Sequence, residues 1–514
     1  MSSAPGRRRL GSLAALLVAL LLALTGCGGT SLAENRGDPK TLTIAAVQDN
    51  NSFDTAQLQL GNNMQYWWPV YDTLIIVNAQ AELEPGLATD WTYNDDETIL
   101  TLNLRDDVVF SDGTAFTSAA VKANLEHLAN GGGQFSYMAQ GITEVVPVSD
   151  TIVELHLDRP DPGLLDALAL IAGAMASPAA LEDPSLATNP VGSGPYVYDA
   201  GASTVGSEYI YTRNPDYWNP QAYEFNTIVI RPMPEATAML NALKTGQVDT
   251  GSIPISNVSE AENSGLRIDT TPVNWRGLII ADRAGAVVPA LGDVRVRRAI
   301  NMAFNKPVMV ENVLYGQGEV TAQPFGVESQ AYVPELDDAY PYDLDQARAL
   351  MAEAGYADGF DVTMPNTSGF NYINPFVAQQ LGDIGIRVHF EQVPANSLIP
   401  ELLSGRFPMY FFSLGSQDAW GDFRKTLLPN SPWNTSKSDS PELAALIETV
   451  RYTEPGEERT AAMQDVNRWV VDQAWFAPFF RENTVLASNP RIELTPHAWL
   501  VATRIDDYHL AETN

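Results

Sequence analysis

The segment Pro190-Val191-Gly192-Ser193-Gly194-Pro195-Tyr196 decides the fold of this 514-residue chain, and Arg213-Asn214-Pro215-Asp216-Tyr217-Trp218 follows it after a short interval. Two prolines and two glycines in seven residues cannot continue a helix or a regular strand, so the backbone must follow a tight, fixed path. A phosphate-binding loop is not indicated, because the third glycine and the lysine of such loops are absent. The segment therefore predicts a rigid corner that joins larger parts of the protein.

The length and the charge of the chain restrict its class. A chain of 514 residues is too long for one hydrophobic core and should divide into two or three lobes. Its 63 acidic residues outnumber the 30 basic ones, which gives a net charge of −33 at pH 7. Such a chain is repelled by the phosphate backbone of nucleic acids, so we expect no nucleic-acid partner.

The first residues have the composition of an export signal. Arginines occupy positions 7–9, and an apolar run extends from Leu10 to Leu24. Leu24-Thr25-Gly26-Cys27 then matches the cleavage site of a bacterial lipoprotein, and Cys27 is the only cysteine in the chain. The alternative is an uncleaved transmembrane anchor, but the apolar run is shorter than the ~20 residues that a membrane span needs.

We therefore expect residues 1–26 to be a lipoprotein signal peptide and residues 27–39 to be a flexible tether that begins at acylated Cys27. Lipid would then hold the protein on the extracytoplasmic face of the cell membrane. No run after Cys27 is long and apolar enough to cross a bilayer. Because there is no second cysteine, the fold has no intramolecular disulfide and must rest on its core.

Two helices in the second half of the chain have clear start signals. Asp293 and Asp343 each stand just before a run whose apolar residues recur at helical spacing, so both can cap a helix. Arg295, Arg297 and Arg298 fall largely off the apolar stripe that follows Asp293. We interpret these arginines as a solvated face and not as an anion-binding site.

A regular alternation of strands and helices follows in the third quarter of the chain. We expect strands near 360–364, 386–390 and 409–412, with helices near 375–383 and 397–403. This rhythm is typical of an α/β lobe with parallel strands. Ligands of such sheets lie at the carboxyl ends of the strands. The loop after the last strand, residues 413–420, is polar and carries both an acid and a large aromatic residue.

The sequence lacks the usual signatures of an enzyme. The five histidines do not show a His-Glu-x-x-His or another paired spacing, so no metal site is predicted. There is no Gly-x-Ser-x-Gly nucleophile elbow and no Walker loop, and no cofactor is predicted. A secreted hydrolase that uses two of the many carboxylates stays open as the alternative, because sequence alone cannot measure their separation.

Six blocks of the chain, in the same order, resemble the solute-binding proteins of the peptide and nickel ABC importers, and the resemblance extends from about Thr41 to the late 470s. The blocks are Tyr71-Asp72-Thr73-Leu74 with Glu84-Pro85-Gly86-Leu87-Ala88, then Phe110-Ser111-Asp112-Gly113-Thr114, the corner at 190–196 with 213–218, residues 242–249, residues 293–306 and residues 342–356.

The resemblance implies an α/β fold of the periplasmic-binding-protein type (type II, cluster C). It has three lobes with mixed sheets and a ligand cleft between two main lobes. The implied boundaries are listed here: lobe I consists of 40–62, 190–270 and 490–514, lobe II is an insertion of 63–189, and lobe III is 271–489. These blocks are features of the fold and do not identify a ligand.

The resemblance also implies candidate ligand-binding residues. In peptide binders of this family, an aspartate in the loop after a strand of the third lobe pairs with the free amino group of the ligand, and Asp418 is the matching candidate, with Asp422 as the alternative. The other candidate pocket residues are Phe53, Asp54, Asn274, Trp275 and Trp420. Core packing is the alternative role for each aromatic residue, and its loop position favours Trp420 as a ligand contact.

We therefore expect a monomeric receptor that captures a di- or oligopeptide and delivers it to the membrane permease of an ABC importer. No reaction would be catalysed. Ligand binding would shift an open ensemble to a closed one. The alternative ligands are an oligosaccharide stacked on Trp275 and Trp420, and a nickel chelate.

Overall fold

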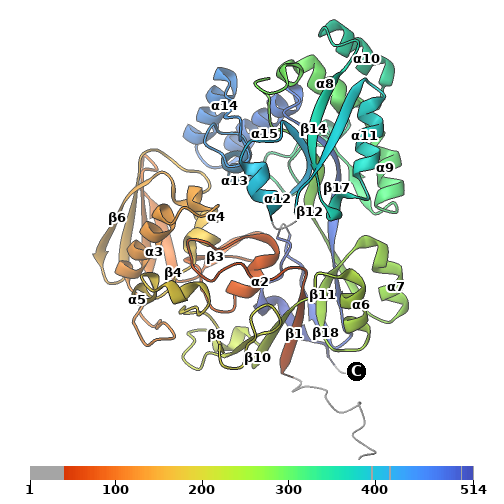
Figure 1. Cartoon of the computed structure of the whole chain (residues 1–514). Helices are drawn as coiled ribbons and strands as arrows, with labels where there is room; N and C mark the ends of the chain where they lie inside the picture. Colours follow the sequence, from red (N-terminus) through yellow and green to blue (C-terminus); the bar gives the residue numbers. More distant parts are fainter. Residues whose placement is uncertain (1–39, 395–396, 416–417, 499, 513–514) are drawn as a thin grey trace, which may run out of the picture. The chain divides into compact units, whose positions relative to one another are not determined.

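The computed structural model describes residues 40–512 except 395–396, 416–417 and 499. The chain divides into two units, Met1–Thr41 and Leu42–Asn514, and the second unit holds the fold (Figure 1). Cys27 and the predicted signal peptide and tether lie outside the described residues. No helix in the described part of the chain is both long and apolar enough to span a membrane.

A nine-stranded mixed sheet is the largest element of the structure, and its main path has the order β16-β12-β17-β11-β1-β10-β9-β8. A short ninth strand, β13, pairs with β17. The strands are β1 (Thr41–Ala46), β8 (Tyr196–Tyr198), β9 (Tyr209–Arg213), β10 (Thr227–Pro232), β11 (Thr250–Ile253), β12 (Arg267–Ile280), β13 (Gly318–Val320), β16 (Met409–Gly415) and β17 (Phe476–Ser488). The β1–β11 pair is parallel, whereas β12 is antiparallel to both of its neighbours.

The two longest strands, β12 and β17, pair from Arg267 with Ser488 to Ile279 with Phe476. Their register shifts between Pro272 and Asn274. A shift at this point has a local cause, because proline has no N–H group to donate to the ladder. The two strands join the part of the sheet around β11 to the part around β16 (Figure 1).

A separate four-stranded antiparallel sheet has the order β4-β5-β7-β6. Its strands are β4 (Ala88–Tyr93), β5 (Ile99–Leu104), β6 (Ile142–Ser149) and β7 (Ile152–Leu157). Leu100, Leu102 and Leu104 of β5 are buried and alternate with half-buried residues, as a strand with one covered face requires. Helix α3 (Ser118–Asn130) packs on β6 and β7. The smaller elements nearby are β2 (Ile75–Val77), β3 (Leu83–Pro85), α2 (Met64–Trp67), α4 (Leu164–Leu168) and α5 (Pro178–Leu181).

The predicted alternation in the third quarter of the chain is present, but one pairing differs. Strands β14 (Phe360–Asn366) and β15 (Ile386–Gln392) form the expected parallel pair. The expectation of parallel pairing is wrong for β16, which pairs antiparallel with β12 in the large sheet. The reason is that β16 forms seven antiparallel residue pairs with β12, which is distant in sequence. Local periodicity does not reveal such a partner.

The remaining elements complete the described part of the chain. They are α6 (Ala236–Lys244), α7 (Val258–Asn263), α8 (Val294–Met302), α9 (Lys306–Val313), α10 (Leu344–Glu353), α11 (Asn374–Gly382), α12 (Leu398–Leu403), α13 (Ala419–Thr426), α14 (Pro441–Tyr452), α15 (Glu457–Asp472), β18 (Ile492–Leu494) and β19 (Tyr508–Leu510).

The two predicted helix caps are confirmed, and the predicted arginine face is partly wrong. Asp293 accepts a hydrogen bond from Arg295 N (2.8 Å), and Asp343 accepts one from Gln346 N (2.9 Å). Arg297 is buried, and its guanidinium donates hydrogen bonds to the carbonyl oxygens of Leu291, Gly292 and Gln473. This arginine therefore joins the start of α8 to the end of α15.

The corner at 190–196 packs directly against the backbone that precedes β2. Gly194 N donates to Val70 O (3.0 Å), and a Cβ on Gly192 would lie 1.9 Å from the same oxygen. Only glycine fits so close to another backbone. The corner is therefore a rigid joint, as the sequence predicts.

The carboxylate of Asp72 connects the corner to the second sequence signature. Ser193 Oγ donates to Asp72 Oδ2 (3.0 Å), Tyr217 OH donates to Oδ1 (2.9 Å), and Trp218 Nε1 donates to Oδ2 (3.3 Å). Burial raises the pKa of Asp72 to about 6, although these hydrogen bonds oppose the shift. The signature residues therefore meet at one half-buried acid.

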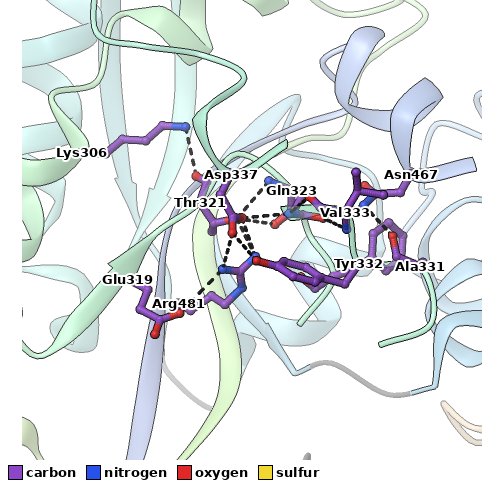
Figure 2. A network of polar contacts seen from close by, with 11 residues as sticks. Lys306, Glu319, Thr321, Gln323, Ala331, Tyr332, Val333, Asp337, Asn467 and Arg481 are labelled. Carbon is purple, nitrogen blue, oxygen red and sulfur yellow. Dashed lines mark hydrogen bonds and ion pairs between the residues drawn. The ribbon is translucent and has the colours of Figure 1, made fainter. Parts of the chain in front are cut away.

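A second polar network, largely buried, surrounds Arg481 on one face of β17 (Figure 2). Arg481 of β17 donates to both oxygens of Asp337, and Thr321 Oγ1 and Tyr332 OH donate to the same carboxylate. Lys306 is buried close by, and its Nζ donates to Thr321 O (3.0 Å). Burial lowers the pKa of Lys306 to about 7, and the nearby Asp337 and Asp338 oppose this shift.

Replacing Lys306 with methionine should change how stability depends on pH. The folded-state pKa of Lys306, about 7, lies below the ordinary value of 10.5, so between these values the unfolded chain binds a proton that the folded chain does not. The contribution of Lys306 to stability therefore rises with pH across this window, by about 1 kcal/mol per pH unit. Urea unfolding of both proteins at about pH 7.5 and 8.5 measures the difference.

Lys244→Met is the matched control, because Lys244 is a half-exposed surface lysine paired with Glu260. The free-energy difference between this variant and the parent protein should stay constant over the same pH range. Parallel stability curves for Lys306→Met and the parent protein would contradict a lowered pKa at Lys306.

Candidate functional site

Asp418 lies between the end of β16 and the start of α13. Its Oδ1 accepts a hydrogen bond from Gly421 N (2.8 Å), so the side chain caps α13. Burial raises the pKa of Asp418 well above its usual range, and the negative charge of Asp166 on α4 adds to this rise. Within the described residues, no lysine or arginine forms an ion pair with Asp418.

Trp420 is buried against the segment that precedes α4. Its side chain is 1% exposed, and Nε1 donates to Asp161 Oδ1 (2.7 Å). Arg424, one turn further along α13, forms an ion pair with Asp161 Oδ2 (2.8 Å), and both of these side chains are about 10% exposed. The guanidinium of Arg451 lies over the ring of Trp420, 4.8 Å from its centre. Asp161 therefore holds α13 through two side chains.

Gly163 permits this close approach. A Cβ at this position would lie 2.7 Å from Trp420 Cδ1 and 3.3 Å from Asp418 Oδ1. The first distance is too short for any real contact, so a larger residue would separate the two segments. The segment 161–163 belongs to the predicted lobe II and α13 to the predicted lobe III, and both contribute to the surroundings of Asp418.

Asp422, the alternative to Asp418, points toward its own helix. Its Oδ1 accepts from Lys425 Nζ (2.6 Å), and the same ammonium donates to Gly415 O (2.6 Å). The charge of Asp422 is therefore balanced inside the protein. Of the two carboxylates, Asp418 is the better candidate for a cationic group of a ligand.

The other predicted residues are placed apart from one another. Trp275 is buried in the same apolar cluster as Trp420 and packs on Phe476 with ring centres 5.4 Å apart. Asn274 lies between β16 and β17, with its backbone opposite Gly415 and Glu482. Phe53 belongs to a different apolar cluster.

Asp54 and Phe53 have structural partners. Asp54 Oδ1 lies 2.6 Å from His127 Nε2 and also accepts from Ala56 N. Phe53 packs on Tyr198 with ring centres 5.3 Å apart. The structure thus brings Asp418 and Trp420 together, with Trp275 in the same cluster, but it does not bring Phe53 or Asp54 to them.

A cavity of about 610 Å³ lies beside β12 and β17. On one side it is lined by Val47, Asn62, residues 252–256 and Val501, from the segments predicted as lobe I, and on the other side by Arg276, residues 312–315, Tyr372 and residues 482–485, from the segments predicted as lobe III. A cavity of this size can accept a small ligand. None of the six predicted ligand-binding residues lines it.

Two sequence signals could have indicated this cavity. Glu482-Asn483-Thr484 is a polar run inside the apolar segment 476–488, and Arg276 interrupts the apolar part of β12 in the same way. Charged residues inside a central strand need a partner or a polar space beside the sheet. Among the residues that the structure describes, no group of three or more His, Cys, Asp or Glu side chains could hold a metal ion.

Residues 82–434 match the model of a known family, described as the bacterial extracellular solute-binding proteins, family 5, middle region. The chain belongs to this family. The match covers both the corner at 190–196 and the β16–α13 junction.

The similar proteins agree with this family assignment. The glutathione-binding protein GsiB of Escherichia coli (strain K12) is 28% identical over 345 residues, which are 65% of this chain and 65% of GsiB. DppA of Helicobacter pylori, solved with the peptide STSA, has a TM-score of 0.83 at 23% identity and covers 92% of this chain and 98% of its own. NikZ of Campylobacter jejuni, solved with Ni(L-His), has a TM-score of 0.78 at 20% identity over 92% and 100% of the two chains. The two solved structures show that the fold is shared.

Gly163→Ala should loosen the contact between α13 and the segment before α4. The new methyl group would overlap the Trp420 ring, and overpacking of this kind costs roughly 1–3 kcal/mol. Hydrogen exchange should therefore become faster in residues 160–168 and 418–426 than in the parent protein. Gly382→Ala is the control, because a Cβ there meets no atom within 4 Å. Unchanged exchange rates in both segments of the Gly163→Ala variant would show that Gly163 and Trp420 do not pack as closely as described.

Proposed function

We propose that this protein is the receptor of an ABC importer and that it captures a di- or oligopeptide with a free amino group. The observation that carries the proposal is the carboxylate of Asp418, which is half-buried between two predicted lobes and forms no ion pair with a lysine or arginine among the described residues. A buried carboxylate without a cation is costly, and an ammonium group of a ligand would offset that cost.

The surroundings of Asp418 favour a cation over a neutral polar group. Asp166 is close enough to raise the pKa of Asp418, and burial raises the pKa of Asp166 itself to about 6. The two acids therefore create a negative potential that Arg424, occupied by Asp161, only partly offsets. This is the electrostatic environment in which a ligand ammonium binds best.

The packing around Asp418 suggests how capture and closure are coupled. The contacts of Trp420 and Arg424 with Asp161 exist only when the predicted lobes II and III are in contact. A ligand that touches Asp418 would then add its contacts to the closed state only, and so shift the protein toward that state.

The remaining features of the proposal follow from family membership and the N-terminal sequence. The protein would be lipid-anchored through Cys27 on the extracytoplasmic face, with residues 27–39 as a tether. It would act as a monomer, deliver its ligand to the membrane permease and catalyse no reaction. The lobe boundaries implied by the resemblance would separate the rigid bodies that close on the ligand.

Asp418→Asn tests the proposed contact without changing the shape of the site. Asparagine can still accept from Gly421 N and cap α13, but it cannot pair with an ammonium group. Calorimetry with glutathione, the dipeptide Met-Leu and the tetrapeptide Ser-Thr-Ser-Ala should show that at least one binds the parent protein. Asp418→Asn should weaken that binding roughly tenfold to a hundredfold, and N-acetylation of the peptide should do the same. If none of the three peptides binds, the peptide assignment is wrong.

Proton release on binding is a second consequence of the raised pKa of Asp418. The ammonium group stabilises the carboxylate and lowers its pKa, so a fraction of the protein must lose a proton when the peptide binds. Affinity should therefore fall as pH falls through the raised pKa of Asp418, while the amino group of the peptide stays charged. Calorimetry in buffers of different ionisation enthalpy measures the proton count. Equal proton release by Asp418→Asn would exclude Asp418 as the source.

A further inference from the structure

The turn between β4 and β5 carries a residue in an unusual backbone conformation. Glu97 has φ of +51°, in the left-handed region that residues with a long side chain rarely adopt. Glycine and asparagine are the ordinary residues at such a position. The turn itself is held by Asn94, whose carbonyl oxygen accepts from Glu97 N (3.0 Å) and whose side-chain oxygen accepts from Thr98 N (2.8 Å). These bonds do not use the carboxylate of Glu97, so the reason for a glutamate lies outside the turn.

The side chain of Glu97 contacts α15, which is distant in sequence. Arg459 Nη2 forms an ion pair with Glu97 Oε2 (2.8 Å), and the two side chains are only 11% and 21% exposed. The guanidinium is also held from its own side, because Arg459 Nε donates to Thr453 O in the turn before α15. An ion pair that is this well shielded from solvent is stronger than an exposed one. It joins the β4–β5 turn of the predicted lobe II to α15 of the predicted lobe III.

Two further arginines make contacts of the same kind. Arg451, near the end of α14, is buried and donates from Nη1 to Pro160 O (2.5 Å). Arg424 of α13 pairs with Asp161 and also donates to Tyr137 O. Arginines of three successive helices in the predicted lobe III thus contact acceptors in three segments of the predicted lobe II. Glu97 is the acceptor whose backbone conformation is strained.

We propose that Glu97 and Arg459 form a latch that holds the predicted lobes II and III together before any ligand binds. The inference goes beyond the proposed function, because it concerns the ligand-free protein, and it rests on the predicted lobe boundaries. Every group of this contact belongs to the protein itself, so the closed form gains its free energy without a ligand.

The strain at Glu97 favours a role in closure over a role in the turn. A left-handed glutamate destabilises the turn whether the two predicted lobes touch or not, and asparagine would avoid most of this cost. The ion pair with Arg459 offsets the cost only while the lobes touch. The turn is therefore stabilised by closure more than an asparagine turn would be.

Such a latch changes what a ligand has to supply. A ligand that binds only the closed form has an apparent affinity proportional to the closed fraction of the free protein. The latch would raise that fraction for every ligand alike. Discrimination between ligands would then stay with the groups that touch them.

Glu97→Asn tests the latch in the ligand-free protein. Asparagine suits the left-handed turn, but it is shorter and carries no charge for Arg459. Cys27 is replaced with serine, and nitroxide labels are placed on cysteines at Val148 and Val308, which are exposed in the predicted lobes II and III. Double electron–electron resonance should show a shift toward longer label distances, with a closed-to-open ratio lower by roughly fivefold or more. Identical distance distributions in the parent protein and the variant overturn the inference.

Ala81→Asn is the matched control. Ala81 is also a left-handed residue in a hairpin turn (φ +65°), between β2 and β3, and its methyl side chain carries no charge. The same relief of backbone strain should therefore leave the distance distribution unchanged. A shift as large as that of Glu97→Asn would show that turn strain and not the ion pair controls closure, and would overturn the inference.

A double-mutant cycle separates the ion pair from any local effect of each substitution. Removing either partner abolishes the pair, so E97N/R459Q should lower the closed-to-open ratio no more than the stronger of the two single variants. Independent, additive effects of E97N and R459Q overturn the inference.

The peptides of the preceding subsection give a second measurement. Glu97→Asn should weaken their binding by up to the factor by which it lowers the closed-to-open ratio, although Glu97 is remote in sequence from Asp418. An unchanged affinity in a variant with a lowered ratio overturns the inference. Failure of all peptides to bind the parent protein overturns the proposed function, whereas the ligand-free distances still decide whether the latch exists.

Discussion

The pairing of β12 with β17 is the constraint on which the structure depends. These strands join the β11 side of the large sheet to the β16 side, and the cavity lies against them. Arg481 and Glu482 are consecutive residues of β17. The network of Arg481 and Asp337 on one face of the sheet and the Arg276–Glu482 ion pair on the other face therefore share the same backbone. A shift of one residue in register would exchange these two faces. The Asp337 network therefore also protects the geometry of the cavity.

The parts of the fold that could be predicted from sequence are those with local causes. Gly192 and Gly194 are required by a backbone contact with Val70, and the composition of the corner indicates such a contact. The caps at Asp293 and Asp343 follow from side chains close to their own helices. By contrast, the buried position of Arg297 and the antiparallel partner of β16 depend on α15 and β12, which are distant in sequence. Periodicity carries no information on such partners.

The site was less predictable than the fold, because its residues also meet through contacts between segments that are distant in sequence. The resemblance indicates Asp418, and the structure adds a physical argument, because Asp422 is already paired with Lys425. Arg276 and Glu482 belong to strands that are ordinary in their apolar pattern, and they meet only through the β12–β17 register. A charged residue in a central strand is therefore a signal that needs its cross-strand partner before it can be interpreted.

The ion pair of Arg424 with Asp161 fixes the surroundings of Asp418, the proposed ligand-binding residue. Both side chains are about 10% exposed, so the pair contributes little net stability once the cost of desolvation is included. Its effect is on geometry, because the same Asp161 also accepts from Trp420 Nε1. The two contacts fix the start of α13 against Gly163 and so orient the Asp418 carboxylate. If Asp418 contacts the ligand as proposed, a cationic ligand group is favoured over a neutral one there, because Asp418 forms no ion pair with a lysine or arginine among the described residues.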